Sequence, residues 1–65
     1  MTHLSKNEGF DIVVNGVVVR SFRDQREAAY DRARYLKTRH PKDFVEVLDQ
    51  ATGAKLVVFE DGRLT

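Results

Sequence analysis

The chain has 65 residues and a formal net charge of +1 at pH 7, with 42% hydrophobic and 32% charged residues and no cysteine. This balance is typical of one small globular domain, and it excludes a disordered chain, a disulfide-stapled fold and thiolate chemistry. The two histidines, His3 and His40, are too few for a zinc site, and no apolar run approaches the roughly 20 residues of a membrane span. We expect a cytoplasmic domain without a metal, a cofactor or a membrane partner.

The domain boundaries follow from where hydrophobic patterning begins and ends. Residues 1–9 show no periodicity, so we expect a flexible N-terminal tail. Patterned sequence continues over residues 10–60, which we expect to form the single domain, and residues 61–65 are expected to be a frayed end. For a chain of this size, the free energy gained by burying apolar surface and the cost of ordering the chain nearly cancel, so additional burial against a partner would matter.

The first patterned segment, residues 10–22, predicts a β-hairpin. Asn15 and Gly16 separate two runs that are rich in β-branched residues. An Asn-Gly pair between such runs is a strong hairpin signal, because both residues tolerate the positive φ angles of a type I′ turn. A two-residue turn fixes the register, and it predicts that Ile12 lies opposite Val19.

A helix is predicted next. Asp24, followed three residues later by Glu27, is typical of an N-cap with its capping-box partner. Pro41 disfavours helical geometry in the residue before it, so the helix is expected to end near Arg39. Residues at helical spacing form an apolar stripe of mainly small side chains, which would let the helix lie close to a sheet. This stripe comprises Ala29, Ala33 and Leu36.

A second hairpin is predicted over residues 44–59. Gly53 is expected to supply the positive φ angle that closes its loop. The register that keeps one face wholly apolar places Val45 opposite Val58. A shift by one residue would bring Lys55 onto that face, so we reject the shifted register.

These elements define an α+β fold, a two-layer ββαββ domain in which one helix covers one face of a four-stranded, mainly antiparallel sheet. The fourth strand is the most apolar, which favours a central place for it and the spatial order first, second, fourth, third. The order second, first, third, fourth is the main alternative. The expected core consists of Phe10, Ile12, Val14, Val17, Val19, Ala29, Ala33, Leu36, Val45, Val47, Leu56 and Val58.

Catalytic chemistry finds little support in the sequence. There is no nucleophile elbow, phosphate-binding loop, dinucleotide fingerprint or zinc-protease motif. Ser21 falls near a strand end without a predicted base beside it, and a strand-end hydroxyl usually bonds locally. His40 is expected at the helix C-terminus, where its charged form suits the helix dipole, although a titrating switch is the alternative. We expect no enzymatic activity and no small-molecule substrate.

The uncovered face of the sheet is the more informative feature. An antiparallel sheet that faces water normally alternates to polar residues, but here the alternation is incomplete. A contiguous apolar patch usually marks an interface, so we expect a protein partner, most simply a second copy of the chain. The alternative is that a tail folds over this face through Leu4 or Leu64. The predicted interface residues are Val13, Val18, Phe22, Phe44, Leu48, Val57 and Phe59.

The distribution of charge suggests a second function. The segment from Arg20 to Lys42 carries eight basic and three acidic side chains, a net charge of +5, and six of the eight are arginine. Arginine forks suit phosphate groups, so weak nucleic-acid binding is an alternative function, and an ordinary solvated helix face is the simpler interpretation. The predicted nucleic-acid contacts are Arg23, Arg32, Tyr35 and Arg39.

Several local motifs resemble those of small bacterial and phage domains of unknown function with ββαββ order. The motifs are structural and lie in residues 14–17, 21–29, 33–36, 45–49 and 52–53. The resemblance implies the fold and carries no catalytic residue. A fainter similarity connects the chain to the arm-binding domains of phage integrases. Those domains place three strands before the helix, whereas this chain has two, so no DNA-contacting residue is transferred.

Overall fold

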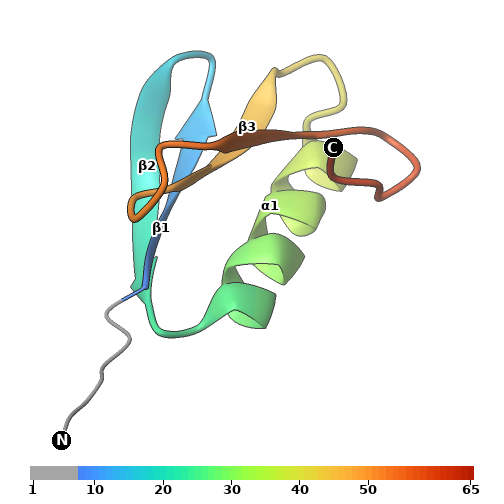
Figure 1. The fold of residues 1–65 in the computed structure, drawn as a ribbon. Coiled ribbons are helices and arrows are strands. Elements are labelled where there is room, and N and C mark those ends of the chain that lie inside the picture. The colour runs from blue at the N-terminus through green and yellow to red at the C-terminus, as the bar shows by residue number, and fades with distance from the viewer. Residues whose placement is uncertain (1–7) are drawn as a thin grey trace, which may run out of the picture.

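Four strands and one helix make up the fold of residues 8–65, the part of the chain that the structure, a computed structural model, describes (Figure 1). The elements are β1 (Gly9–Val14), β2 (Val17–Arg23), α1 (Arg26–Arg39), β3 (Val45–Asp49) and β4 (Lys55–Val58). All neighbouring strands are antiparallel and α1 packs on one face of the sheet, which confirms the predicted α+β class. A tail was predicted for residues 1–9. Residues 1–7 lie outside the described part of the chain, and Gly9 is the first residue of β1.

The strand order is β2-β1-β3-β4, so the favoured sequence-based order is wrong and its alternative is correct. β1 takes the central place because it is apolar on both faces. Phe10 and Ile12 are buried on the helix side, and Val13 is only 7% exposed on the other. β2 and β3 both lie antiparallel to β1, so the helix connects two parallel strands across it.

A β-bulge changes the predicted register of the first hairpin. Val14 pairs with Val17 as the two-residue turn requires, but the register shifts between Ile12 and Val13, and Ile12 then lies opposite Arg20 rather than Val19. An extra residue in one strand moves every later side chain to the other face. The sequence pattern of β2 does not reveal the bulge, because its three consecutive valines fit either register.

The bulge and the edge position of β2 correct three predictions. Phe22 lies opposite Phe10 and packs against the core on the helix side, so it does not belong to the open face. Val17 and Val19 are 62% and 53% exposed, although both were expected in the core. β2 is an outer strand, and nothing among the described residues covers these two side chains.

The second hairpin has the predicted register. Val45 pairs with Val58, and Leu48 pairs with Lys55. Gly53 has a φ angle of +78°, and its backbone N–H donates to the Asp49 carbonyl at 2.7 Å. Turn chemistry and the apolar face of the two strands are both local signals, and they agree here.

The C-terminal residues are paired rather than frayed. The backbone N–H of Thr65 donates to the Val57 carbonyl at 3.0 Å, and the Val57 N–H donates to the Thr65 carbonyl at 3.1 Å. Leu64 forms a bridge with Val58 and packs against the core. Since Leu64 lies on the core side, it does not cover the open face. The alternative residue for this role, Leu4, lies outside the described residues.

The helix ends as predicted but begins differently. It ends at Arg39, and the His40 N–H donates to the Leu36 carbonyl. Its N-cap is Gln25, which makes no side-chain cap hydrogen bond, so the prediction of an Asp24 cap is wrong. Asp24 has a φ angle of +59°, and its Oδ1 accepts the Glu8 backbone N–H at 2.9 Å, while its own N–H donates to the Glu8 carbonyl.

Asp24→Ala should therefore destabilise the domain by about 1–2 kcal/mol. Alanine has no oxygen for the Glu8 N–H, and a side chain at positive φ is strained. Asp24→Gly is the matched control, because it loses the same hydrogen bond but adopts positive φ without strain. Urea unfolding followed by circular dichroism should rank the wild type above Asp24→Gly, and Asp24→Gly above Asp24→Ala. Equal stability of the two variants would show that backbone strain at Asp24 is unimportant.

The core lies between α1 and the sheet, and α1 contacts all four strands. Ala29 and Ala33 have no exposed surface, and their small side chains bring the helix close to the sheet. Phe10 meets Tyr30 edge-on, with ring centroids 6.2 Å apart. The buried cluster comprises Phe10, Ile12, Ala29, Ala33, Val45, Val47 and Val58, with Val14, Phe22, Tyr30, Leu36 and Leu64 partly buried against it.

Candidate interaction surface

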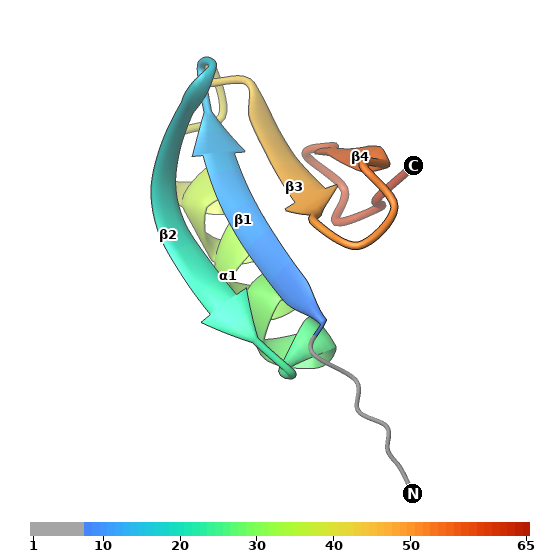
Figure 2. The same cartoon turned by 60° about the vertical axis from the view of Figure 1, so that its left-hand side comes forward.

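The face of the sheet opposite α1 divides into a polar and an apolar part. Figure 2 shows this face with α1 behind the strands. In the polar part, Asp11 Oδ1 accepts hydrogen bonds from Ser21 Oγ and from Gln50 Nε2, both at 2.7 Å. The end of the Gln50 side chain lies where a Cβ of Gly9 would be, so a larger residue at that position would displace Gln50 from this network. This network links β2, β1 and the loop after β3. The apolar part of the face lies toward the other end of the strands.

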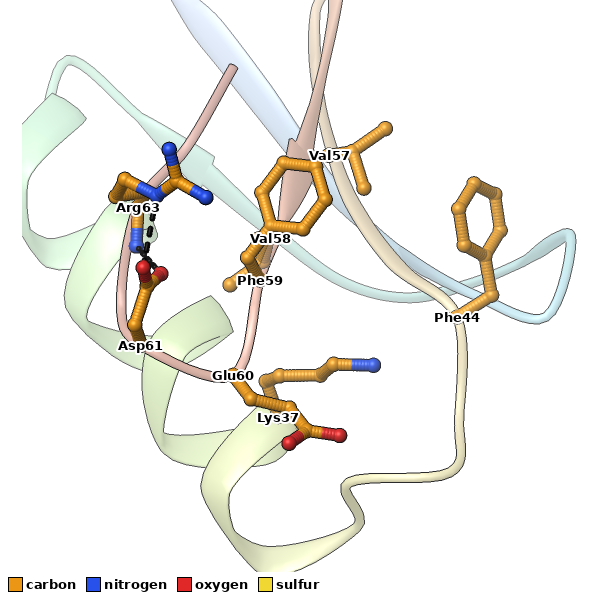
Figure 3. A pocket seen from close by; sticks show the side chains of 8 residues that line it. All are labelled: Lys37, Phe44, Val57, Val58, Phe59, Glu60, Asp61 and Arg63. Carbon is orange, nitrogen blue, oxygen red and sulfur yellow. Dashed lines mark hydrogen bonds and ion pairs between the residues drawn. The ribbon is translucent and has the colours of Figure 1, made fainter.

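The apolar part ends in an open hollow of about 480 Å³. Its apolar lining comprises Phe44, Val57, Val58 and Phe59, and all of these except Val58 are predicted interface residues. Phe44 and Phe59 are 49% and 40% exposed. Figure 3 shows the two rings standing on either side of the hollow, one from the segment before β3 and one from the segment after β4. The complete lining is Lys37, Phe44, Val57, Val58, Phe59, Glu60, Asp61 and Arg63.

Phe44 is held in place by the turn between β1 and β2. The Asn15 N–H donates to the Phe44 carbonyl at 2.8 Å, and Asn15 Oδ1 accepts the Phe44 N–H at 2.9 Å. Asn15 Nδ2 also donates to Asp43 Oδ1 at 3.2 Å. Asn15 therefore forms the turn at a φ angle of +52° and also fixes the backbone that carries one wall of the hollow.

Lys37 holds the same loop from the helix. Its ammonium donates to the carbonyls of Pro41 and Asp43, at 2.9 and 2.7 Å. A cation near the helix C-terminus also interacts favourably with the helix dipole. The last turn of α1 and the β1–β2 turn thus fix the approach to β3 from two sides.

Phe59 is held by the turn that follows β4. Asp61 accepts the Arg63 N–H at 3.0 Å and the Arg63 Nε at 2.8 Å, and the guanidinium carbon lies 5.4 Å from the centroid of the Phe59 ring. The backbone hydrogen bond from Arg63, with its charge and its side-chain bond, lowers the pKa of Asp61 below the ordinary value of 3.8 despite some desolvation. The ionised Asp61 carboxylate orients a cation over one face of the ring and leaves the other face open.

The other predicted interface residues are less exposed or lie further away. Val13 is buried, Leu48 is half-buried, and Val18 is 52% exposed at the edge in β2. Phe22 lies on the helix side. The structure thus brings together three of the seven predicted residues around one hollow, and it adds Lys37, Glu60, Asp61 and Arg63, which the sequence analysis did not select.

The predicted nucleic-acid residues gather only in part. Arg32 and Arg39 lie with their guanidinium carbons 5.5 and 5.7 Å from the centroid of the Tyr35 ring, and Arg39 Nη1 donates to the Tyr35 hydroxyl at 3.1 Å. Neither arginine forms an ion pair with any residue between 8 and 65. Arg23 lies before the start of α1, and the 14-residue helix separates it from Arg39 by roughly 20 Å along the axis.

The residues considered for catalysis occupy structural positions. Ser21 Oγ donates to Asp11, and His40 is the C-cap of α1. Within residues 8–65, no three side chains of the His, Cys, Asp and Glu types come close enough to hold a metal ion. Across the same part of the chain, no helix combines the length and the apolar character that crossing a bilayer requires.

Comparison with known proteins returns no relative. The chain matches no protein-family model, no curated protein and no solved structure. The resemblance to small bacterial and phage ββαββ domains stays a prediction, and the functional argument rests on the surfaces described above.

Proposed function

We propose that this chain is a cytoplasmic, non-enzymatic protein-interaction module that associates with a second copy through the apolar part of its open sheet face. The observation that carries the proposal is the hollow between Phe44 and Phe59. The backbone that carries Phe44 is fixed by Asn15, and the Phe59 ring is held against Arg63, so part of the entropy cost of binding is already met in the free protein. Aromatic side chains beside a fixed apolar recess are the usual centre of an interface.

The charges around the hollow support self-association in particular. Lys37 and Arg63 stand beside Glu60 and Asp61 along its lining. In a twofold dimer each surface meets its own copy, so a patch that carries both signs of charge can be complementary to itself. A 65-residue domain with a small core also gains stability from the apolar area that such a dimer buries.

Sedimentation analysis at micromolar concentration tests the dimer. We expect a species near twice the 7.5 kDa mass of the chain, and we expect Phe44→Lys/Phe59→Lys to be monomeric, because buried unpaired cations oppose association. Tyr35→Lys is the matched control, since Tyr35 is an aromatic residue of similar exposure, 48%, on the helix. A wild-type monomer, or equal dissociation of the double variant and the control, would contradict self-association through this face.

A second candidate function is weak nucleic-acid binding, favoured by the cluster of Arg32, Tyr35 and Arg39. Two guanidinium groups that form no ion pair within residues 8–65 flank an exposed aromatic ring, which suits a phosphate backbone and a stacked base. So few contacts would give non-specific binding whose affinity falls steeply with salt. A plot of the logarithm of the binding constant against the logarithm of the salt concentration would have a slope of about −0.9 per phosphate contacted.

Titration of labelled duplex and single-stranded DNA at two salt concentrations tests this second function. Arg32→Gln/Arg39→Gln should weaken binding and reduce the salt slope by about 2. The control Arg26→Gln/Arg63→Gln changes the charge equally but removes arginines that pair with Glu8 and Asp61. No binding at low salt would exclude nucleic acid as a ligand, and equal losses in both variants would exclude this cluster as the contact.

A further inference from the structure

Among residues 8–65, no strand pairs with the outer edge of β2. β2 pairs only with β1, and Figure 2 shows it as the outer strand of the sheet. At the opposite edge, Thr65 pairs with β4. The backbone N–H and C=O groups of Phe10 and Ile12 in β1 point toward β2. Because these groups alternate in direction along an antiparallel strand, the N–H and C=O groups of Val18, Ser21 and Arg23 in β2 point away from β1. No hydrogen bond from residues 8–65 reaches these outward groups.

The side chains along this edge are apolar at one end and basic at the other. Val17, Val18 and Val19 are 62%, 52% and 53% exposed, and Arg20 and Arg23 follow them. Neither arginine forms an ion pair within the described residues. The guanidinium carbon of Arg20 lies 5.0 Å from the centroid of the Phe22 ring, which leaves its hydrogen-bond donors available to a partner.

The flank of α1 beside this edge is also basic. Arg34 donates to the Gly62 carbonyl and Lys37 to the Asp43 carbonyl, so these two residues mark the flank of α1 toward β3, β4 and the C-terminus. By helical periodicity Arg32 and Arg39 occupy the opposite flank, on the β2 side of the molecule. Together with Arg20 and Arg23, four arginines without carboxylate partners lie on this side.

This charge decides which occupant fits the edge. A second copy of β2 paired antiparallel would set the arginines of each strand against the valines of the other strand, so it would offer the arginines no carboxylate. A strand that carries carboxylates would instead pair with these arginines and still bury the valines. We propose that β2 accepts an extended acidic segment of a partner protein, which adds to the sheet as a further strand.

The bulge sets where such a strand can pair. Val19 has no partner in β1, so the ladder is interrupted between Val18 and Arg20. An added strand would take its backbone hydrogen bonds from the outward groups of Val18 on one side of this interruption and of Ser21 and Arg23 on the other, and its apolar side chains would lie against the valines. The edge is separate from the hollow between Phe44 and Phe59, so this inference does not depend on self-association.

A capped peptide of about eight residues, with valines in one half and glutamates in the other, is the test ligand, and the same peptide with lysines in place of the glutamates is its control. We expect the acidic peptide to bind the full chain at low salt, with amide shifts and slowed hydrogen exchange centred on Val18 and Ser21 in NMR spectra. Arg20→Glu/Arg23→Glu should weaken the acidic peptide about tenfold or more and should favour the lysine peptide instead. Arg26→Glu/Arg63→Glu is the control for net charge, and it should leave the preference for the acidic peptide in place.

A second variant tests the backbone pairing. Val18→Pro removes one outward N–H from an edge strand, where proline is tolerated, and Val18→Thr keeps it. Weaker binding by the proline variant alone supports strand addition. Equal binding of both peptides, amide shifts confined to the hollow or to the exposed face of α1, or displacement of the peptide by a short thymidine oligonucleotide would each overturn the proposal; the last result would identify nucleic acid as the ligand.

Discussion

Phe10→Ala should leave the domain largely unfolded at 25 °C. Phe10 is 1% exposed, and it contacts Tyr30 edge-on while the guanidinium carbon of Arg26 lies 5.6 Å from its ring centroid. Truncating a buried phenylalanine to alanine costs about 3–5 kcal/mol. That cost is comparable with the entire stability of about 3–5 kcal/mol that a domain of this size obtains from one core.

Circular dichroism and one-dimensional NMR at a fixed protein concentration measure this loss. Tyr35→Ala is the matched control, because Tyr35 is 48% exposed on α1, outside the proposed dimer surface, and its truncation should change the free energy of unfolding by about 1 kcal/mol or less. Phe10→Leu, which retains most of the buried area, should fold with a lower urea midpoint. A cooperative unfolding transition of Phe10→Ala close to that of the wild type would show that the Phe10 side chain is not part of the core.

Ala33→Leu should have the second largest effect, a loss of about 1–3 kcal/mol. Ala33 has no exposed surface and lies where α1 approaches the sheet most closely through its small side chains. Three additional carbon atoms there must push the helix away from the sheet or take a strained rotamer. The gain in apolar area does not compensate, because the packed interior has no space for it.

Ala28→Leu controls for helix propensity, since Ala28 is exposed on the same helix and leucine forms helices nearly as well as alanine. We expect its free energy of unfolding to differ from that of the wild type by about 0.5 kcal/mol or less. Urea unfolding of the two variants at the same concentration separates packing from propensity. Equal stability of Ala33→Leu and Ala28→Leu would contradict the close contact between α1 and the sheet.

The candidate surface could be predicted only in part. The sequence indicated Phe44, Val57 and Phe59, because a strand pattern with apolar residues on both faces leaves some of them uncovered. It did not indicate Lys37, Asn15 or Asp61 as the residues that shape the hollow. Lys37 and Asn15 act on Asp43 and Phe44 across six and 29 positions, and no local pattern marks such contacts.

Local sequence signals were enough to predict the four strands and the helix, the end of α1 at Arg39 and the register of β3 against β4. Each of these depends on a local signal, such as the proline that follows the helix or the glycine at a φ angle of +78° in the second loop. The central place of β1, the bulge in β2 and the hydrogen bonds between Asp24 and Glu8 follow from contacts that no local signal marks. They depend on how the strands are ordered under the helix and on which backbone groups need a hydrogen-bond partner. Both depend on contacts between segments that are distant in the chain.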